Sequence, residues 1–241
     1  MNALALLFLF GPGQPPKDPA PDAKAEAEES GAVAKKLAGE FVVEIEKGGK
    51  KVKLERDAEP VLRWSNHLGR RFYGDVFVWT YKGRPEAVAS VNNVFGQKRV
   101  TEAELVSLST GRPLLTHNEK LVWGPAEPGV ELKPLPGAPK PAATAAARLT
   151  QMRALAAQFA VAADYGIDKE QKEDLRLMAT PIFRYQSAEQ DVADGGLFAF
   201  TKGTDPDALL VIEARQKKDG AEWQYAFARL NGWCVLRGTH R

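Results

Sequence analysis

Two stretches of the chain share one pattern: GDVFVWTYKGRPEAV at Gly74–Val88 and GGLFAFTKGTDPDAL at Gly195–Leu209. Each opens on glycine, carries two aromatic residues two positions apart, and reaches a Lys-Gly step followed by Pro, an acid and Ala. Side chains alternate between the two faces of a strand, so both rings of each stretch share one face. Glycine suits a turn with positive φ, and proline can only open the next strand or lie in the turn. The pattern therefore predicts two β-hairpins, each burying an aromatic face.

Matched residue pairs also precede the two hairpins. The first half has Leu62-Arg63 and Arg71-Phe72, and the second half has Leu175-Arg176 and Arg184-Tyr185. The offset between the halves is 113 for these pairs and 121 for the hairpins, which places an insertion around residues 186–194. Hairpins in general do not share such spacing. We therefore predict a duplication, with quasi-repeats at residues 60–123 and 173–236.

The segment between the repeats, residues 124–166, combines a loop and a helix. Gly124–Pro141 is rich in Pro and Gly, which is typical of a linker or long surface loop. Ala142–Tyr165 has apolar residues at helical spacing and is followed by Gly166, a favoured residue after a helix. We predict a single α+β domain over residues 39–241, mainly antiparallel β, with two quasi-repeated hairpin units and one long helix between them.

The N-terminus has the pattern of an exported protein. Ala3–Phe10 is an apolar run that is too short to span a bilayer but suits the core of a signal peptide, so we assign residues 1–13 to a signal peptide. The alternative is a first strand or helix of the fold. Residues 14–38 are rich in Pro, Ala and Glu and are predicted to form a disordered tether, whose second half could continue into a short helix through Ala32–Glu40. We expect an exported protein that is periplasmic, held in the cell envelope or secreted.

Several segments resemble a family of uncharacterised exported proteins from planctomycete bacteria. They are LRWSN at Leu62–Asn66, GDVFVWTYKGRPEAVASV at Gly74–Val91, LVSLSTG at Leu105–Gly111 and LFAFTKGTDPDALLVIEAR at Leu197–Arg215. The resemblance covers most of the chain after about residue 39. It implies export and a single fold, and it carries no activity or catalytic residue to this chain.

Composition and motifs exclude several classes of function. Lys and Arg number 33 against 31 Asp and Glu, and the formal charge of +2 gives no reason to expect a nucleic-acid partner. Cys234 is the one cysteine, and its place beside Trp233 in an apolar run indicates a buried, inert thiol. The three histidines have no ligand spacing, and neither a nucleophile elbow nor a phosphate-binding loop is present. We therefore expect no metal, no cofactor, no transmembrane segment and no recognisable catalytic residue.

Four arginines are the first candidate ligand-binding residues: Arg63, Arg71, Arg176 and Arg184. They recur at matched positions in both halves, and arginine offers a planar, bidentate fork to anions. One interpretation is an anion or carboxylate clamp where the halves meet. The structural alternative is pairing with carboxylates near the turns, such as Asp75 or Asp194.

Tryptophans supply the remaining candidates. Trp79 corresponds to Phe200 in the repeat, which favours a core position. Trp64 and Trp223 have no aromatic counterpart and are predicted to lie at the surface of a ligand groove. Together these features favour a non-catalytic binding or structural protein whose partner is a protein or small ligand. The alternative is a hydrolase-type enzyme with its site at the junction of the repeats, where Glu86 and Asp207 are among the available acids.

Overall fold

The structure is a computed structural model that describes residues 4–8, 22–66, 71–96, 98–166 and 172–240. It confirms the predicted class, because the fold is mainly antiparallel β with two helices. The described strands form three sheets, one of which curls into a half-barrel.

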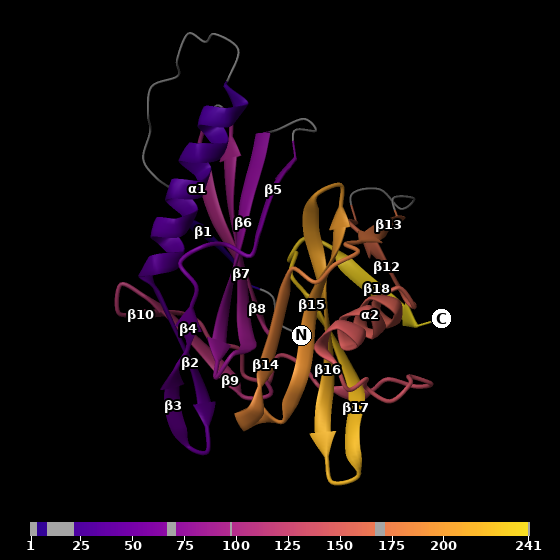
Figure 1. The fold of residues 1–241 in the computed structure, drawn as a ribbon. Helices are drawn as coiled ribbons and strands as arrows, with labels where there is room; N and C mark the ends of the chain where they lie inside the picture. Colours follow the sequence, from indigo (N-terminus) through magenta and orange to yellow (C-terminus); the bar gives the residue numbers. More distant parts are fainter. Residues whose placement is uncertain (1–3, 9–21, 67–70, 97, 167–171, 241) are drawn as a thin grey trace.

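The first half of the chain contains two sheets and helix α1 (Ala23–Glu40), which packs across β6 and β7 (Figure 1). The larger sheet has the order β1-β8-β7-β6-β4, and β5 also pairs with β6. Its strands are β1 (Leu4–Phe8), β4 (Glu55–Arg56), β5 (Leu62–Asn66), β6 (Arg71–Tyr81), β7 (Arg84–Phe95) and β8 (Val100–Ser107). The smaller sheet has the order β10-β9-β2-β3, formed by β2 (Phe41–Lys47), β3 (Lys50–Lys53), β9 (Arg112–His117) and β10 (Lys120–Trp123).

The second half contains helix α2 (Ala145–Ala156) and one curled sheet. The strand order is β11-β17-β16-β15-β13-β12-β18, and β14 also pairs with β15. The strands are β11 (Lys133–Pro134), β12 (Phe159–Asp164), β13 (Lys172–Leu177), β14 (Phe183–Ser187), β15 (Val192–Lys202), β16 (Asp205–Lys217), β17 (Gly220–Arg229) and β18 (Val235–His240), with a short 3-10 turn, η1, at Ala188–Gln190. In the described part of the chain the curl does not close, because the edge strand β18 pairs with neither β11 nor β17.

Both hairpins expected from the sequence are present, as β6–β7 and β15–β16. Their turns use positive φ angles, 86° at Gly83 and 62° at Gly203, which glycine adopts without a steric penalty. Phe77 and Phe198 lie in the first strand of each hairpin and are fully buried. The aromatic faces are therefore core faces, as predicted.

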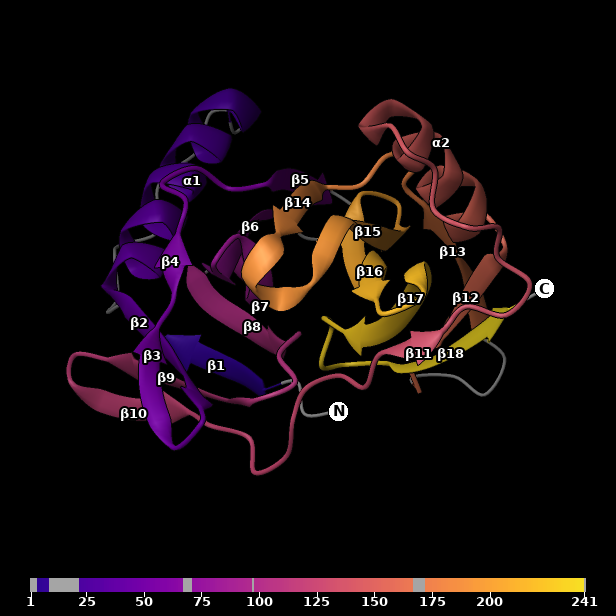
Figure 2. The same cartoon turned by 60° about the horizontal axis from the view of Figure 1, so that its bottom comes forward.

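Three apolar layers hold these elements together. One lies between the larger first sheet, α1 and the smaller sheet, and includes Phe77 and Trp79. A second lies inside the curl beneath α2, around Phe198 and Phe200. The third lies between the two large sheets, which stand back to back between α1 and α2 (Figure 2). This central layer joins the two halves into one body.

The helix predicted at residues 142–165 is too long. The structure ends α2 at Ala156 and continues with β12, whose residues alternate between buried and partly exposed. An Ala-rich segment fits a helical and an alternating pattern equally well. The segment forms a strand because β13 and β18 pair with it and supply backbone hydrogen bonds. These partners lie outside the segment, so the local pattern does not predict them.

The tether predicted at residues 14–38 is wrong from residue 23 onward, because Ala23–Glu40 is helix α1. The short helix considered for Ala32–Glu40 is therefore present, but it begins earlier. Asp22 caps the helix by accepting from the backbone N–H of Lys24 and Ala25. The small residues that suggested disorder form the buried face, with Ala34 and Ala38 at 0% exposure. Residues 14–21 and most of the segment assigned to a signal peptide lie outside the described residues, while Leu4–Phe8 forms β1 beside β8. Export therefore stays a prediction.

Candidate functional site

Two of the four candidate arginines form structural pairs, as the second interpretation of the sequence predicted. Arg63 on β5 approaches Asp75, with 3.0 Å between its Nε and Oδ1, as a close ion pair without an aligned hydrogen bond. Arg184 on β14 donates from Nε and Nη2 to Asp194 at 2.9 and 2.7 Å. Both carboxylates are buried, at 3% and 0% exposure. Burial raises the pKa of Asp75, and Arg63 partly offsets this.

The other two arginines have different partners again. Arg71 binds Glu26 of α1 through its Nε, at 2.9 and 3.0 Å from the two carboxylate oxygens. Arg176 donates from Nη2 to the carbonyl oxygen of Gly203 at 3.1 Å. The four guanidinium groups therefore do not share an anion, and the predicted clamp is wrong. Each arginine instead links a different pair of secondary-structure elements or turns.

The prediction that Trp64 and Trp223 lie at the surface is also wrong, since they are 6% and 2% exposed. Trp64 lies directly over Gly74, where a Cβ would come within 2.2 Å of the indole ring. The core position predicted for Trp79 is confirmed, at 2% exposure. The tryptophan that does reach solvent is Trp233, at 70% exposure, in the turn before β18. The exposure of Trp233 depends on how the sheet curls, so the local sequence pattern does not predict it.

The strands β17 and β18 face each other across a pocket of about 490 Å³, which we name the seam pocket. It is lined mainly by Val161 (β12), Ala208 (β16), Phe227 and Arg229 (β17), and Leu236 and Gly238 (β18). Gly238 pairs with Val161 across β12 and β18, and Ala208 pairs with Arg229 across β16 and β17, so each side of the pocket carries one small residue. A Cβ on Gly238 would touch the Phe227 ring at 3.3 Å. The pocket exists because these positions carry almost no side chain.

One end of the seam pocket is polar. Arg229 is on the same face of β17 as Phe227, because side chains alternate along a strand. Its Nη1 donates weakly to the carbonyl oxygen of Cys234, at 3.4 Å. Its Nε is buried and has no hydrogen-bond partner among the described residues. Cys234 is 3% exposed, and burial raises the pKa of its thiol to about 12, which agrees with the predicted inert residue.

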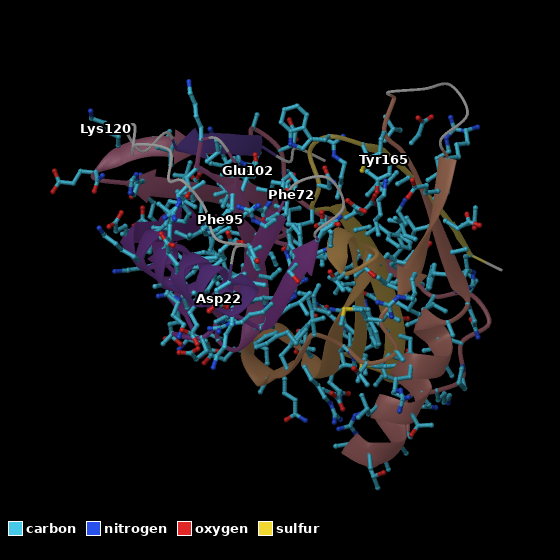
Figure 3. The ribbon with its side chains drawn as sticks, turned by 90° about the horizontal axis from the view of Figure 1, so that it is seen from above. Asp22, Phe72, Phe95, Glu102, Lys120 and Tyr165 are labelled. Atoms are coloured by element: carbon cyan, nitrogen blue, oxygen red, sulfur yellow. The ribbon has the colours of Figure 1, made fainter. Side chains whose placement is uncertain are left out.

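Beside that end of the pocket, four carboxylates gather where β8 and β16 meet, and we name this cluster the acidic end. Its members are Glu102 and Glu104 of β8 and Asp205 and Asp207 of β16. Burial, together with the negative charge of the neighbouring carboxylates, raises the pKa of Glu104 to about 7 and that of Asp205 to about 8. Figure 3 labels Glu102, a member of the acidic end, and Tyr165 of the second half of the chain.

The acidic end holds the turn that precedes β18. Glu104 accepts from the backbone N–H of Gly232 at 2.9 Å and from Asn92 Nδ2 at 3.1 Å. Asp207 accepts from the Tyr165 hydroxyl at 2.7 Å and from Asn231. Carboxylates from both halves thus fix the backbone beside the seam pocket.

The opposite end of the central layer has a compensated charge cluster. Arg84 is 1% exposed and lies between Glu86, 3.2 Å from Nη1, and Glu213, 2.8 Å from Nε. Glu213 also accepts from the Tyr185 hydroxyl at 2.8 Å and from Arg215 at 2.7 Å. Burial alone would lower the pKa of Arg84, but the two carboxylates hold it above its usual value. Sequence analysis missed this cluster, although a glutamate inside the apolar run LLVIEAR was a usable signal.

Replacing Asp205 with asparagine is expected to stabilise the protein at alkaline pH. The folded protein holds this proton up to a pKa of about 8, whereas an unfolded aspartate releases it near 3.8, so the free energy of unfolding falls as pH rises between those values. At pH 8.5 the substitution should raise the free energy of unfolding by about 1–3 kcal/mol, and near pH 4 it should change little. Urea unfolding at both pH values measures this, with the exposed Asp219→Asn as control. Equal effects at the two pH values would contradict it.

Among the described residues, no group of three or more His, Cys, Asp or Glu side chains is arranged to hold a metal ion. No helix in the described part of the chain is long and apolar enough to cross a membrane. Comparisons with protein-family models, curated proteins and solved structures find no match, so function must be inferred from the geometry of the site.

Proposed function

We propose that this protein is an exported, non-catalytic binding protein that takes up a small apolar molecule in the seam pocket. The volume of about 490 Å³ falls within the range of about 300–1,000 Å³ that is common for ligand pockets. The wall is apolar apart from Arg229 and is supplied by four strands of one sheet, so it is largely preformed. This pocket is the observation that carries the proposal. Export is tested separately, by mass spectrometry of the mature N-terminus.

The duplication of the chain is a second part of the proposal. β2 pairs with β3 and β9, and β12 pairs in the same way with β13 and β18, each after a helix. Trp64 lies opposite Gly74 in β6, and Tyr185 lies opposite Gly195 in β15, at the same offset of 121. This register supports two related halves. It matches Arg63 to Arg184, so the offset of 113 that matched Arg63 to Arg176 does not fit the strands.

Binding in the seam pocket is tested with the neutral fluorescent probe N-phenyl-1-naphthylamine. We expect saturable binding of one probe per chain, because an apolar ring system gains free energy on leaving water for this wall. The variant Gly238→Leu should weaken that binding roughly tenfold or more, because its side chain would grow from the point that faces Phe227. Fluorescence titration measures both dissociation constants.

The matched control is Thr239→Leu, on the next residue of β18, whose side chain points to the opposite face. It adds a similar apolar side chain to the same strand and should leave the probe affinity unchanged. The proposal fails if the probe does not bind, or if Gly238→Leu and Thr239→Leu weaken binding to the same extent. Thermal unfolding of both variants verifies that each is folded.

The hydrolase alternative finds its best support at the acidic end, because a carboxyl group with a pKa of about 7 suits a general acid. Glu104 and Asp207 are, however, only 5% and 1% exposed, and their oxygens already accept hydrogen bonds. A substrate would have to displace the 231–234 turn to reach them. We therefore favour binding. The alternative predicts turnover of p-nitrophenyl esters that disappears in Glu104→Gln, whereas the binding proposal predicts none in either protein.

A further inference from the structure

The hydrogen bonds of Arg229 leave one edge of its guanidinium group without an acceptor among the described residues. Nη1 is used by the Cys234 carbonyl, whereas Nε is buried without a partner among the described residues. Nε and Nη2 together form the side-on edge of an arginine, with two parallel N–H groups. That edge therefore has no hydrogen bond within the described part of the chain, and Arg229 belongs to the wall of the seam pocket.

A buried N–H group without an acceptor is unfavourable, and the cost is larger for a charged group. Arg84 is a buried guanidinium of the same fold whose Nη2 also has no hydrogen-bond partner among the described residues, but Glu86 and Glu213 compensate its charge. No carboxylate of the described residues forms a salt bridge with Arg229, although the acidic end lies nearby. The missing acceptor is the kind of group that a ligand can supply.

We propose that the ligand is an amphiphile with a single anionic headgroup, represented by a medium-chain carboxylic acid. Its carboxylate binds the Nε–Nη2 edge of Arg229 in the bidentate geometry that a guanidinium favours. Its apolar chain lies along Val161, Phe227 and Gly238, the apolar part of the wall. This inference rests on the proposed function and names the class of molecule that the pocket selects.

The test is displacement of N-phenyl-1-naphthylamine from the full chain at pH 8 by decanoate, 1-decanol or decyltrimethylammonium. These probes share one chain length and differ in headgroup charge. We expect decanoate to bind at least about tenfold more tightly than 1-decanol, as charge-assisted hydrogen bonds require, and the cation to bind most weakly. In Arg229→Met the ratio of the two affinities, decanoate over 1-decanol, should fall to about one, each affinity being measured in the same variant.

The matched control is Arg237→Met, an exposed arginine on β18 that removes the same charge from the same region. It should keep the preference for decanoate. The inference is overturned if decanoate binds no better than 1-decanol, or if Arg229→Met keeps the preference, or if Arg237→Met abolishes it equally. In each of these cases binding of the neutral probe leaves the proposed function standing, whereas failure of the neutral probe to bind overturns that function itself.

Discussion

Replacing Arg84 with methionine is expected to lower the free energy of unfolding by about 3–5 kcal/mol, the cost of leaving buried charges without their partner. The substitution keeps most of the side-chain volume but removes the one cation that contacts both Glu86 and Glu213. Both carboxylates are at most 2% exposed, so water cannot replace the guanidinium. Urea unfolding at pH 7 measures the effect.

Two further measurements separate the effect of the lost charge from the effect of altered packing on the free energy of unfolding. The exposed Arg237→Met should change stability by no more than about 0.5 kcal/mol, as is usual for a surface position. Adding Glu86→Gln to Arg84→Met should recover part of the loss, because Glu86 has no other salt bridge among the described residues, whereas Glu213 keeps Arg215. A loss below about 1 kcal/mol in the single variant would show that the cluster is solvated in solution.

Alanine at Gly74 or Gly195 is expected to destabilise the fold by about 1–3 kcal/mol or more, through overpacking. The new Cβ would lie 2.2 Å from the Trp64 ring at Gly74, and 2.5 Å from the Tyr185 ring at Gly195. Both rings are buried, and Trp64 belongs to the central layer while the Tyr185 hydroxyl donates to Glu213, so neither ring can turn away without breaking these contacts. Thermal or urea unfolding measures the loss.

Gly39→Ala in α1 is the control for these glycine substitutions. Its Cβ would have ordinary contacts only, with the nearest atom, Arg56 Nη2, at 3.7 Å, and the helix should gain about 0.5–1 kcal/mol. Combining Gly74→Ala with Trp64→Leu should restore part of the lost stability, because the smaller leucine side chain leaves room for the new Cβ at position 74. Wild-type stability in Gly74→Ala alone would contradict the ring-on-glycine packing.

The hairpins could be predicted from the sequence because their signals are local. Alternating apolar residues and a Gly turn specify a strand, a turn and a strand without reference to the rest of the chain. Helix α1 and strand β12 were mispredicted because Ala-rich segments have weak local preferences. Their state is decided by what they pack against, β6 and β7 for α1 and the partners β13 and β18 for β12.

The candidate site was harder to predict than the fold. The pairs Arg63–Asp75 and Arg184–Asp194 were foreseen as one alternative, because charged residues beside a turn have few other partners. Arg229 carried no signal, since its importance depends on which strands approach it across an unclosed curl. A pocket is a property of long-range register and of small residues such as Gly238, and neither is visible in a short window of sequence.

The unclosed seam between β17 and β18 has a mechanical consequence. No backbone pairing joins these strands in the described part of the chain, so away from the 231–234 turn the width of the gap is set by the bending of the sheet that connects them. The half-barrel should therefore be elastic. The gap between β17 and β18 should widen through small changes of twist distributed over β16, β15, β13 and β12. Ligands of different width could therefore enter without breaking hydrogen bonds between paired strands. Selectivity would then come from the Arg229 guanidinium at the polar end of the seam pocket.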